Sequence, residues 1–346
     1  MTLIWFVIVL GITVFIHELG HFIFAKKADI YVYEFSIGMG PRLFKFKRKN
    51  DETEYSIRLF PIGGFVSMAG EDVEIDKNIP EEKQMYNKTW LQRFLTVIAG
   101  VMFNFILAII LLFIVALNTG APVNKNYISE LSDNYPISKT NIQIGDKILK
   151  VNNKKVKNQD MLMLELTINN GKTINLTVEH KNNQIEVVKV KPKKVEIDGE
   201  TTYKYGMVLE SKIEKGIIPS IKYAFTKTIN LIEQMFMIII YLITGHLSLN
   251  SLSGPVGIYN IVGESAKAGI ISVIYLIAYL CINVGFINLI PIPAFDGGRA
   301  LFLIIEKIRR KKIDPKIENT IHAVGLSLLM VLMVVITFND IVRIFK

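Results

Sequence analysis

Residues 17–21 have the sequence His17-Glu18-Leu19-Gly20-His21 and lie inside an apolar run from Leu3 to Phe24. If this run is helical, the two histidines project from one face, one turn apart, close enough to hold a single metal ion. Zinc suits neutral imidazole nitrogens, and a catalytic zinc keeps one position for water. Glu18 can take a proton from that water and later deliver it to a leaving amine. The stretch therefore predicts a zinc-dependent hydrolytic site within a membrane segment.

The motif by itself is a weak signal, because a His-Glu-x-x-His string also arises by chance in helices. Its setting strengthens it, since ionisable side chains in a membrane segment are costly to bury and usually serve a function. A site of this kind also needs a third protein ligand, which the rest of the chain must supply.

The composition is typical of a membrane protein. The chain has 346 residues, of which 51% are hydrophobic, and its mean hydropathy is positive. The net charge of +9 is expected from lysines and arginines in cytoplasmic loops, and no aromatic-interleaved basic motif for nucleic acid is present. The single cysteine, Cys281, excludes an intramolecular disulfide and a multi-cysteine metal site.

Four segments are long and apolar enough to cross roughly 30 Å of hydrocarbon. They are residues 3–24, 95–117, 270–290 and 321–338. The first segment lacks a basic leader and a small-residue cleavage site, so it is interpreted as a retained span. Residues 217–243 are amphipathic before they become strongly apolar, which favours an interfacial helix.

Basic residues set the predicted orientation. The Lys26-Lys27 pair follows the first span, and a second basic loop lies at residues 307–316. By the positive-inside rule both loops face the cytoplasm, and both chain ends lie outside. The histidine motif and Asp296 then fall toward the cytoplasmic side.

Composition also divides the chain into regions. These are an N-terminal membrane part (1–120), a polar domain (121–205), an interfacial helix with its linker (206–260) and a C-terminal membrane part (261–346). The polar domain follows the second span and is expected outside the cytoplasm. Its predicted elements are strands at 147–151, 173–178 and 185–190 and a helix at 161–168. A turn is predicted at 253–257.

Residues 31–68 are β-prone and are interrupted by glycines, among them Gly63-Gly64. The segment is too apolar for an ordinary cytoplasmic loop and too broken for a span. Two placements remain open. One is a hairpin that dips into the membrane beside the site, and the other is a small sheet on the cytoplasmic face.

Asp296 is the candidate third ligand. It follows a proline-flanked break after the third span, and such breaks are tolerated at membrane depth only where they line protein or a water-filled cavity. Its carboxylate can complete a His, His, Asp set, or it can simply cap the next helix. Asn288, one turn before Pro291, can donate a hydrogen bond to an oxyanion or a substrate backbone, or be a satisfied core amide.

Gly100 and Asn104 lie on one face of the second span. A small residue permits close helix approach and an intramembrane asparagine usually finds a partner, although helix packing alone also accounts for the pair. The remaining histidines, His180, His246 and His322, are predicted to be non-catalytic.

Further motifs are spread along the chain. They are HELGHF at 17–22, FSIGMGP at 35–41, PIGGFV at 61–66, GPVGI at 254–258, and NLIPIP at 288–293 running into DGG at 296–298. Together they resemble the site-2 protease family of intramembrane zinc metalloproteases, and within it the bacterial RseP/RasP-like branch. The resemblance covers nearly the whole chain and is far more specific than any one motif.

The resemblance implies a polytopic α-helical membrane protein with about four transmembrane helices, a membrane-associated β-hairpin or sheet, and one inserted α+β PDZ domain within 121–205. It implies that His17, His21 and Asp296 bind Zn²⁺ and that Glu18 is the general base. Residues 31–68 would clamp substrate as an added strand. The substrate-binding residues would be Asn288, Pro291, Pro293, Gly63 and Gly64. Many members carry two PDZ domains, whereas the length of this chain fits one.

The expected function is intramembrane zinc endopeptidase of the bacterial cytoplasmic membrane, with the lipid bilayer as its surroundings. Expected substrates are single-span membrane proteins after a first cleavage, such as anti-sigma-factor-like proteins, or signal-peptide remnants. The alternative is a membrane PDZ binding or chaperone protein with a structural zinc site. Glu18 separates the two, because a structural zinc needs no base and is normally closed by four protein ligands.

Overall fold

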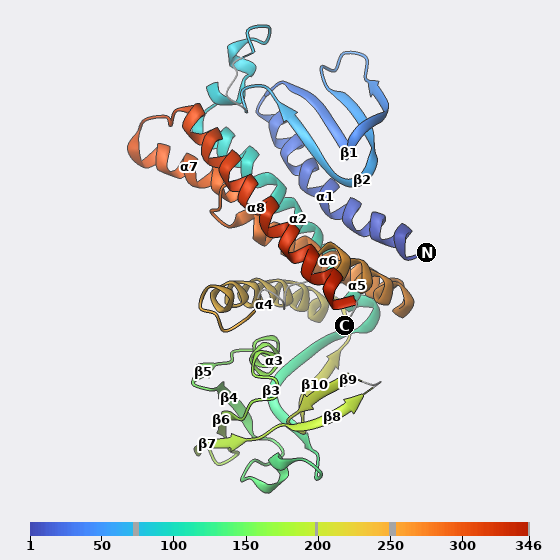
Figure 1. Cartoon of the computed structure of the whole chain (residues 1–346), viewed down its shortest axis with the longest axis vertical. Coiled ribbons are helices and arrows are strands. Elements are labelled where there is room, and N and C mark those ends of the chain that lie inside the picture. Colours follow the sequence, from blue (N-terminus) through green and yellow to red (C-terminus); the bar gives the residue numbers. More distant parts are fainter. Residues whose placement is uncertain (72–75, 198–199, 249–253, 345–346) are drawn as a thin grey trace. The chain divides into compact units, whose positions relative to one another are not determined.

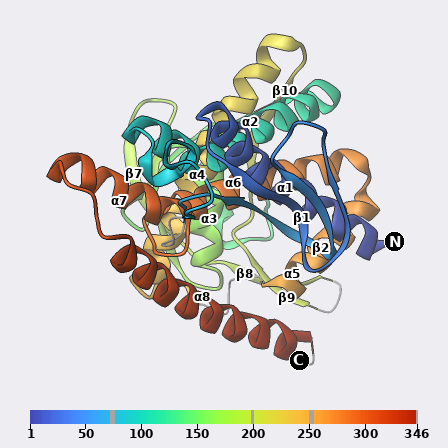
Figure 2. The same cartoon turned by 90° about the horizontal axis from the view of Figure 1, so that it is seen from above.

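A computed structural model describes residues 1–71, 76–197, 200–248 and 254–344 (Figures 1 and 2). The chain divides into two compact units. Unit 1 comprises Met1–Leu112 and Leu249–Lys346, and unit 2 comprises Phe113–Ser248.

Unit 1 is built mainly of helices. They are α1 (Thr2–Lys27), the first part of α2 (Trp90–Thr119), α5 (Pro255–Ala268), α6 (Ile270–Leu289), α7 (Asp296–Arg309) and α8 (Pro315–Ile344). Each of the four predicted spans is confirmed as a helix: α1, α2, α6 and α8. Lys26 and Lys27 form the last turn of α1, where the negative end of the helix dipole favours cations.

Five helices among the described residues are long and apolar enough to cross a membrane, so this is a membrane protein. Four are the predicted spans. The fifth is α4 (Ile217–Ile243), which coincides with the segment predicted to be an interfacial helix. Helix α4 is long enough to cross a membrane, and its C-terminal half is strongly apolar.

The predicted turn at residues 253–257 is wrong from Pro255 onward, where helix α5 begins; Ser253 lies outside the described residues. Proline suits the first helical position because the N–H that it lacks would have no partner there. The Asp340 carboxylate of α8 accepts a hydrogen bond from the Gly257 N–H at 2.9 Å. That acceptor comes from far along the chain, so local turn signals do not show it.

A long bent hairpin, β1 (Val32–Lys47) and β2 (Glu54–Met68), follows α1 and confirms the β-prone segment. Its register pairs Phe35 both with Val66 and with Tyr55. The outer half of the hairpin therefore folds back beside the first half of β1.

The hairpin rests on α1. The ring of Phe35 contacts the rings of Phe15 and Phe22, with centroids 5.9 and 5.0 Å apart. Residues 64–68 of β2 lie at one edge of the sheet, because β1 is their only paired strand among the described residues. Between the hairpin and α2, the chain forms two short 3₁₀ turns, η1 (Glu81–Lys83) and η2 (Met85–Asn87).

Unit 2 contains a mixed α+β fold. Its elements after α2 are β3 (Ala121–Leu131), η3 (Pro136–Lys139), β4 (Lys147–Val151), β5 (Lys154–Lys155), α3 (Gln159–Ile168), β6 (Ile174–Glu179), β7 (Ile185–Val190), β8 (Lys193–Ile197), β9 (Glu200–Lys204), β10 (Met207–Glu214) and α4. The main sheet has the order β10-β3-β4-β6-β7, with β5 beside β4, and β8 and β9 form a separate hairpin. The predicted strands at 147–151, 173–178 and 185–190 and the helix at 161–168 are confirmed.

The core of this fold follows from strand alternation, since every second residue faces inward. Ile148, Leu162, Leu176 and Val178 are completely buried in it. Burying each such side chain stabilises the fold by roughly 1.5–3 kcal/mol. The segment inserted between α2 and α4 therefore has a hydrophobic core of its own.

Helix α4 lies beside α3 (Figure 1), and polar pairs join the two segments. Asn158 Nδ2 donates to Asn230 Oδ1 at 3.1 Å, and Lys227 Nζ lies 2.6 Å from Asp160 Oδ1. A further hydrogen bond joins Tyr241 to Glu165. The other side of α4 exposes large apolar side chains, namely Ile218, Ile221, Phe225, Ile229 and Phe236. One face of α4 is therefore held by protein, and the other is suited to an apolar medium.

We expect the stability of strands β6 and β7 to depend on pH through His180. Its Nε2 lies 3.2 Å from Glu186 Oε2 and its Nδ1 lies 2.8 Å from Asp146 Oδ2. The hydrogen bond to Glu186, followed by that to Asp146, raises the pKa of His180. A raised folded-state pKa stabilises the fold below the unfolded pKa of about 6.5, and this contribution is lost as pH rises through the folded-state pKa.

His180→Asn should therefore reduce hydrogen-exchange protection of β6 and β7 at about pH 5.5 and reduce it much less at about pH 8.5. The measurement is hydrogen exchange on the full chain, with each variant compared with the wild type at the same pH. An equal loss of protection at both pH values would contradict this role.

Candidate metal centre

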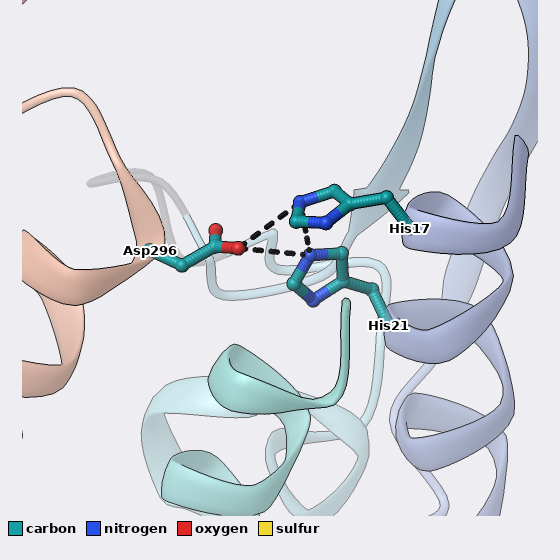
Figure 3. Close-up of side chains that lie close together, drawn as sticks. All are labelled: His17, His21 and Asp296. Carbon is teal, nitrogen blue, oxygen red and sulfur yellow. Dashed lines mark hydrogen bonds and ion pairs between the residues drawn. The ribbon is translucent and has the colours of Figure 1, made fainter. Parts of the chain in front are cut away.

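Helix α1 places two histidines opposite the start of α7. His17 and His21 are 7% and 8% exposed, and Asp296 is the first residue of α7. Figure 3 shows both imidazoles and the carboxylate pointing toward one another. The sequence-predicted ligands thus come together from two segments at opposite ends of the chain.

Their donor atoms form a nearly equilateral triangle. His17 Nε2 lies 3.1 Å and His21 Nε2 lies 3.3 Å from Asp296 Oδ2, and the two nitrogens are 3.2 Å apart. Donors about 2.0 Å from a tetrahedral zinc are about 3.3 Å from one another. The spacing fits three corners of such a tetrahedron, which leaves the fourth for water or substrate.

Hydrogen bonding to α2 orients the His21 ring. Its Nδ1 lies 2.8 Å from the carbonyl oxygen of Thr96. A carbonyl can only accept, so Nδ1 carries the proton, and in the neutral ring that metal binding requires the lone pair of Nε2 faces Asp296. This tautomer is the one that a metal-binding histidine uses, and backbone carbonyls commonly fix it.

Asn104 makes the equivalent contact with His17. Its side-chain amide lies 3.3 Å from His17 Nδ1, and it is completely buried. With the amide oxygen turned toward the ring, Asn104 accepts from Nδ1–H, which also satisfies an Oδ1 atom that otherwise has no hydrogen-bond partner among the described residues. Both histidines then present unprotonated Nε2 atoms to the site.

Gly100 makes room for the two imidazoles. A Cβ atom at this position would overlap Nε2 of His21 and lie 2.8 Å from Cε1 of His17. The Gly100–Asn104 pair therefore does more than allow helix packing, because one residue clears space for the rings and the other contacts a ring. The sequence showed that Asn104 needed a partner, but not that the partner is His17.

The segment before α7 is held by a histidine that was predicted to be non-catalytic. Ala294 adopts a positive φ of 87°, and its N–H donates to His322 Nδ1 at 3.0 Å. Phe295, not Asp296, is the N-cap of α7, and it makes no side-chain capping bond. Asp296 is therefore free to face the histidines, and His322 has a positioning role that sequence reasoning missed.

Glu18 lies beside the second strand of the hairpin. Its side chain is half-buried, and a Cβ atom at Gly64 would lie 3.3 Å from its Cγ. The same Cβ would lie 2.8 Å from the carbonyl oxygen of Ser36. A glycine at this position lets the edge segment of β2 run close to Glu18.

The remaining predicted site residues occupy the neighbouring segments. Asn288 is half-buried in the last turn of α6, and its amide has no hydrogen-bond partner among the described residues. In the break that follows α6, Pro291 is exposed and Pro293 is half-buried. Gly63 of the hairpin adopts a positive φ of 94°, and a Cβ atom there would contact the Met39 side chain. A role in substrate binding stays a prediction for all of them.

Comparison with known proteins agrees with this geometry. The family described as peptidase family M50 matches residues 5–332. The chain belongs to this family.

Two relatives of this M50 peptidase are 32% identical over 422 residues that cover 99% of each chain. They are the regulator of sigma-W protease RasP of Bacillus subtilis (strain 168) and the zinc metalloprotease RasP of Bacillus licheniformis. A Clostridium acetobutylicum protein, provisionally named a zinc metalloprotease, is 35% identical over 336 residues, with 97% of this chain and 96% of that protein covered. The Bacillus alignments exceed the length of this chain, so those relatives carry residues that it lacks.

The chain is a zinc metalloprotease of the M50 family and a bacterial membrane protein. The expected family, enzyme class and cofactor are thereby confirmed. The donor set of two imidazoles and one carboxylate suits Zn²⁺. Asp296 Oδ2 is buried without a hydrogen-bond partner among the described residues, as expected of an atom reserved for a metal.

We predict that Gly100→Ala abolishes stable zinc binding, because the added methyl group overlaps the His21 ring and is too close to that of His17. Zinc content of the purified full chain should fall from near one equivalent to a small fraction of that value. Gly285→Ala is the matched control, since the three atoms nearest to its Cβ would all belong to the Phe105 ring, the first at 3.1 Å. Full zinc occupancy in Gly100→Ala would contradict the role of Gly100.

Proposed function

We propose that His17, His21 and Asp296 hold the zinc and Glu18 serves as the general base of an intramembrane endopeptidase. The observation that carries the proposal is the triangle of three donor atoms. Two of them belong to α1, a helix long enough to cross a membrane. Zinc in this position would polarise the scissile carbonyl and make a water molecule more acidic. A three-ligand set favours catalysis over the binding-protein alternative, because structural zinc normally has four protein ligands.

The protein side chains handle the proton and the substrate backbone. Glu18 accepts the proton of the attacking water and returns it to the amine of the departing segment. Asn288 donates its amide N–H to the substrate backbone or to the developing oxyanion. Its amide is available for this contact because no described residue pairs with it.

The edge of the hairpin supplies a way to present the peptide. Residues 64–68 lie at the edge of the sheet, and Gly64 places that edge beside Glu18. A membrane helix resists hydrolysis because its backbone groups are paired internally. Unwinding it into a strand that pairs with this edge would expose one peptide bond to Glu18.

We propose single-span membrane proteins as the substrates, after a first cleavage outside the membrane has shortened them. The name of the Bacillus subtilis relative, a regulator of sigma-W protease, motivates anti-sigma-factor-like proteins as one class, and signal-peptide remnants are a second. The basic residues at 26–27 and 307–316 support a site on the cytoplasmic side.

The insert at 121–205 is proposed to be one PDZ domain outside the cytoplasm that limits the size of entering substrates. Its antiparallel sheet, with α3 between β5 and β6 in sequence, supports this assignment. Helix α4 is proposed to be interfacial, leaving four transmembrane helices. Polar pairs with α3 occupy one of its faces, and isoleucine and phenylalanine side chains cover the other.

Glu18→Gln should abolish cleavage and leave zinc bound. The assay uses purified protein in liposomes with a tagged single-span substrate that lacks its outer domain. Loss of cleavage on chelation and recovery with added zinc should accompany wild-type activity. Glu264→Gln, an exposed glutamate of α5, is the control and should cut like the wild type. Undiminished cleavage by Glu18→Gln would overturn the assignment of the base.

Asn288→Ala should lower kcat by roughly 10²–10³-fold if its amide stabilises the oxyanion, with zinc content unchanged. Asn283→Ala is the matched control on the same helix, because the side-chain amide of Asn283 donates to the Tyr279 carbonyl one turn earlier. Equal effects of the two substitutions would indicate a packing role for Asn288.

A further inference from the structure

A hollow lined by cations lies where helix α2 begins and helix α7 ends. Its volume is about 470 Å³. The cations that line it are Lys88, Arg93, Lys307, Arg310, Lys311 and Lys312. This basic hollow belongs entirely to unit 1 and takes no part in the proposed chemistry.

Among the described residues, an ion pair balances only one of the six cations of the basic hollow. Glu306 is its one acidic lining residue, and its carboxylate lies 2.6 Å from Arg93 and also accepts from the Ile313 N–H at 2.9 Å. None of the other five cations forms an ion pair within 4 Å with a described residue. Burial and the nearby Arg93 lower the pKa of Lys312, as expected where positive charge is in excess.

Aromatic rings hold two of the lysines in place. Lys312 Nζ lies 3.9 Å from the centre of the Tyr86 ring and donates to the Tyr86 carbonyl at 2.6 Å. Lys307 Nζ lies 5.2 Å from the Trp90 ring. These contacts keep the ammonium groups together despite their mutual repulsion, so the hollow is preorganised for an anion.

Exposed apolar side chains close in sequence to the lining of the basic hollow indicate what carries the anion. Trp90 begins the apolar helix α2, and tryptophan favours the level of the lipid headgroups. Leu91 of α2 and Ile304 and Ile308 of α7 are exposed nearby in sequence, at 56%, 41% and 76%. A ligand with a negative head and hydrocarbon tails would satisfy both kinds of surface.

We propose that the basic hollow binds the phosphate headgroup of an anionic phospholipid, with the acyl chains along α2. Basic pockets between membrane helices are suited to such headgroups. A soluble phosphate would pair with the same cations but would leave the neighbouring leucine and isoleucine side chains exposed. The lipid therefore accounts for more of this surface than a free anion does.

The bound lipid would also brace α2 against α7, the helix that begins with the proposed ligand Asp296. Arg93 and Glu306 join α2 to α7, and Trp90 Nε1 donates to the Leu303 carbonyl at 2.6 Å. Helix α2 orients His21 through Thr96, and α7 begins at Asp296. A headgroup that spans the cations of both helices would resist their separation.

Binding can be measured on the purified full chain in neutral detergent by titration with phosphatidylglycerol, and separately with phosphatidylcholine. Phosphatidylglycerol should bind, and its affinity should fall as salt rises. Lys88→Gln, Arg310→Gln and Lys311→Gln combined should weaken it at least about tenfold, since the triple variant removes three of the six cations that line the hollow. The matched control is Lys139→Gln, Lys172→Gln and Lys191→Gln, which removes three exposed lysines of unit 2.

Equal binding of the two lipids, or equal loss of affinity in the control, would overturn the proposal. Glycerol phosphate that binds as tightly as phosphatidylglycerol, and that competes with it, would show a soluble-anion site and would also overturn it. The titration is repeated on Glu18→Gln protein, so the result does not depend on the proposed function. Circular dichroism of each triple variant checks that loss of binding is not loss of the fold.

Discussion

The packing of unit 1 depends on three polar donor atoms that are buried among apolar helices. A carboxylate and two imidazoles are costly to remove from water unless a partner compensates each one. Asp296 Oδ2 and the two Nε2 atoms face one another at 3.1–3.3 Å. Such an arrangement is stable when a cation occupies its centre, so metal binding and folding of this region are coupled.

Helix α2 supplies most of the support for this arrangement, although it provides no ligand. Thr96 fixes the tautomer of His21, Asn104 contacts His17, and Gly100 leaves room for both rings. These three residues are four apart along the helix and therefore lie on one face. The start of the same helix is joined to α7 through Arg93, so one helix positions the proposed ligands from two distant segments.

Polar chemistry within a membrane protein also needs backbone that is not helical. The bent hairpin and the break before α7 provide it, and both are held by long-range contacts. Phe35 packs on the aromatic rings of α1, and His322 accepts from the Ala294 N–H. The break directly follows the apolar helix α6, and irregular backbone beside a membrane helix is tolerated where it lines protein.

Hydropathy and spacing by themselves determined the spans, the strands of the insert and the pairing of His17 with His21. Helical periodicity and the length of an apolar run are local properties, so the sequence shows them directly. The start of α5, the fold-back of the hairpin and the partners of Asn104 were decided only by tertiary structure. The acceptor at Asp340, the pairing of Phe35 with Tyr55 and the imidazole beside Asn104 all come from segments distant in sequence. No local pattern records such contacts, because packing of the whole chain brings them together.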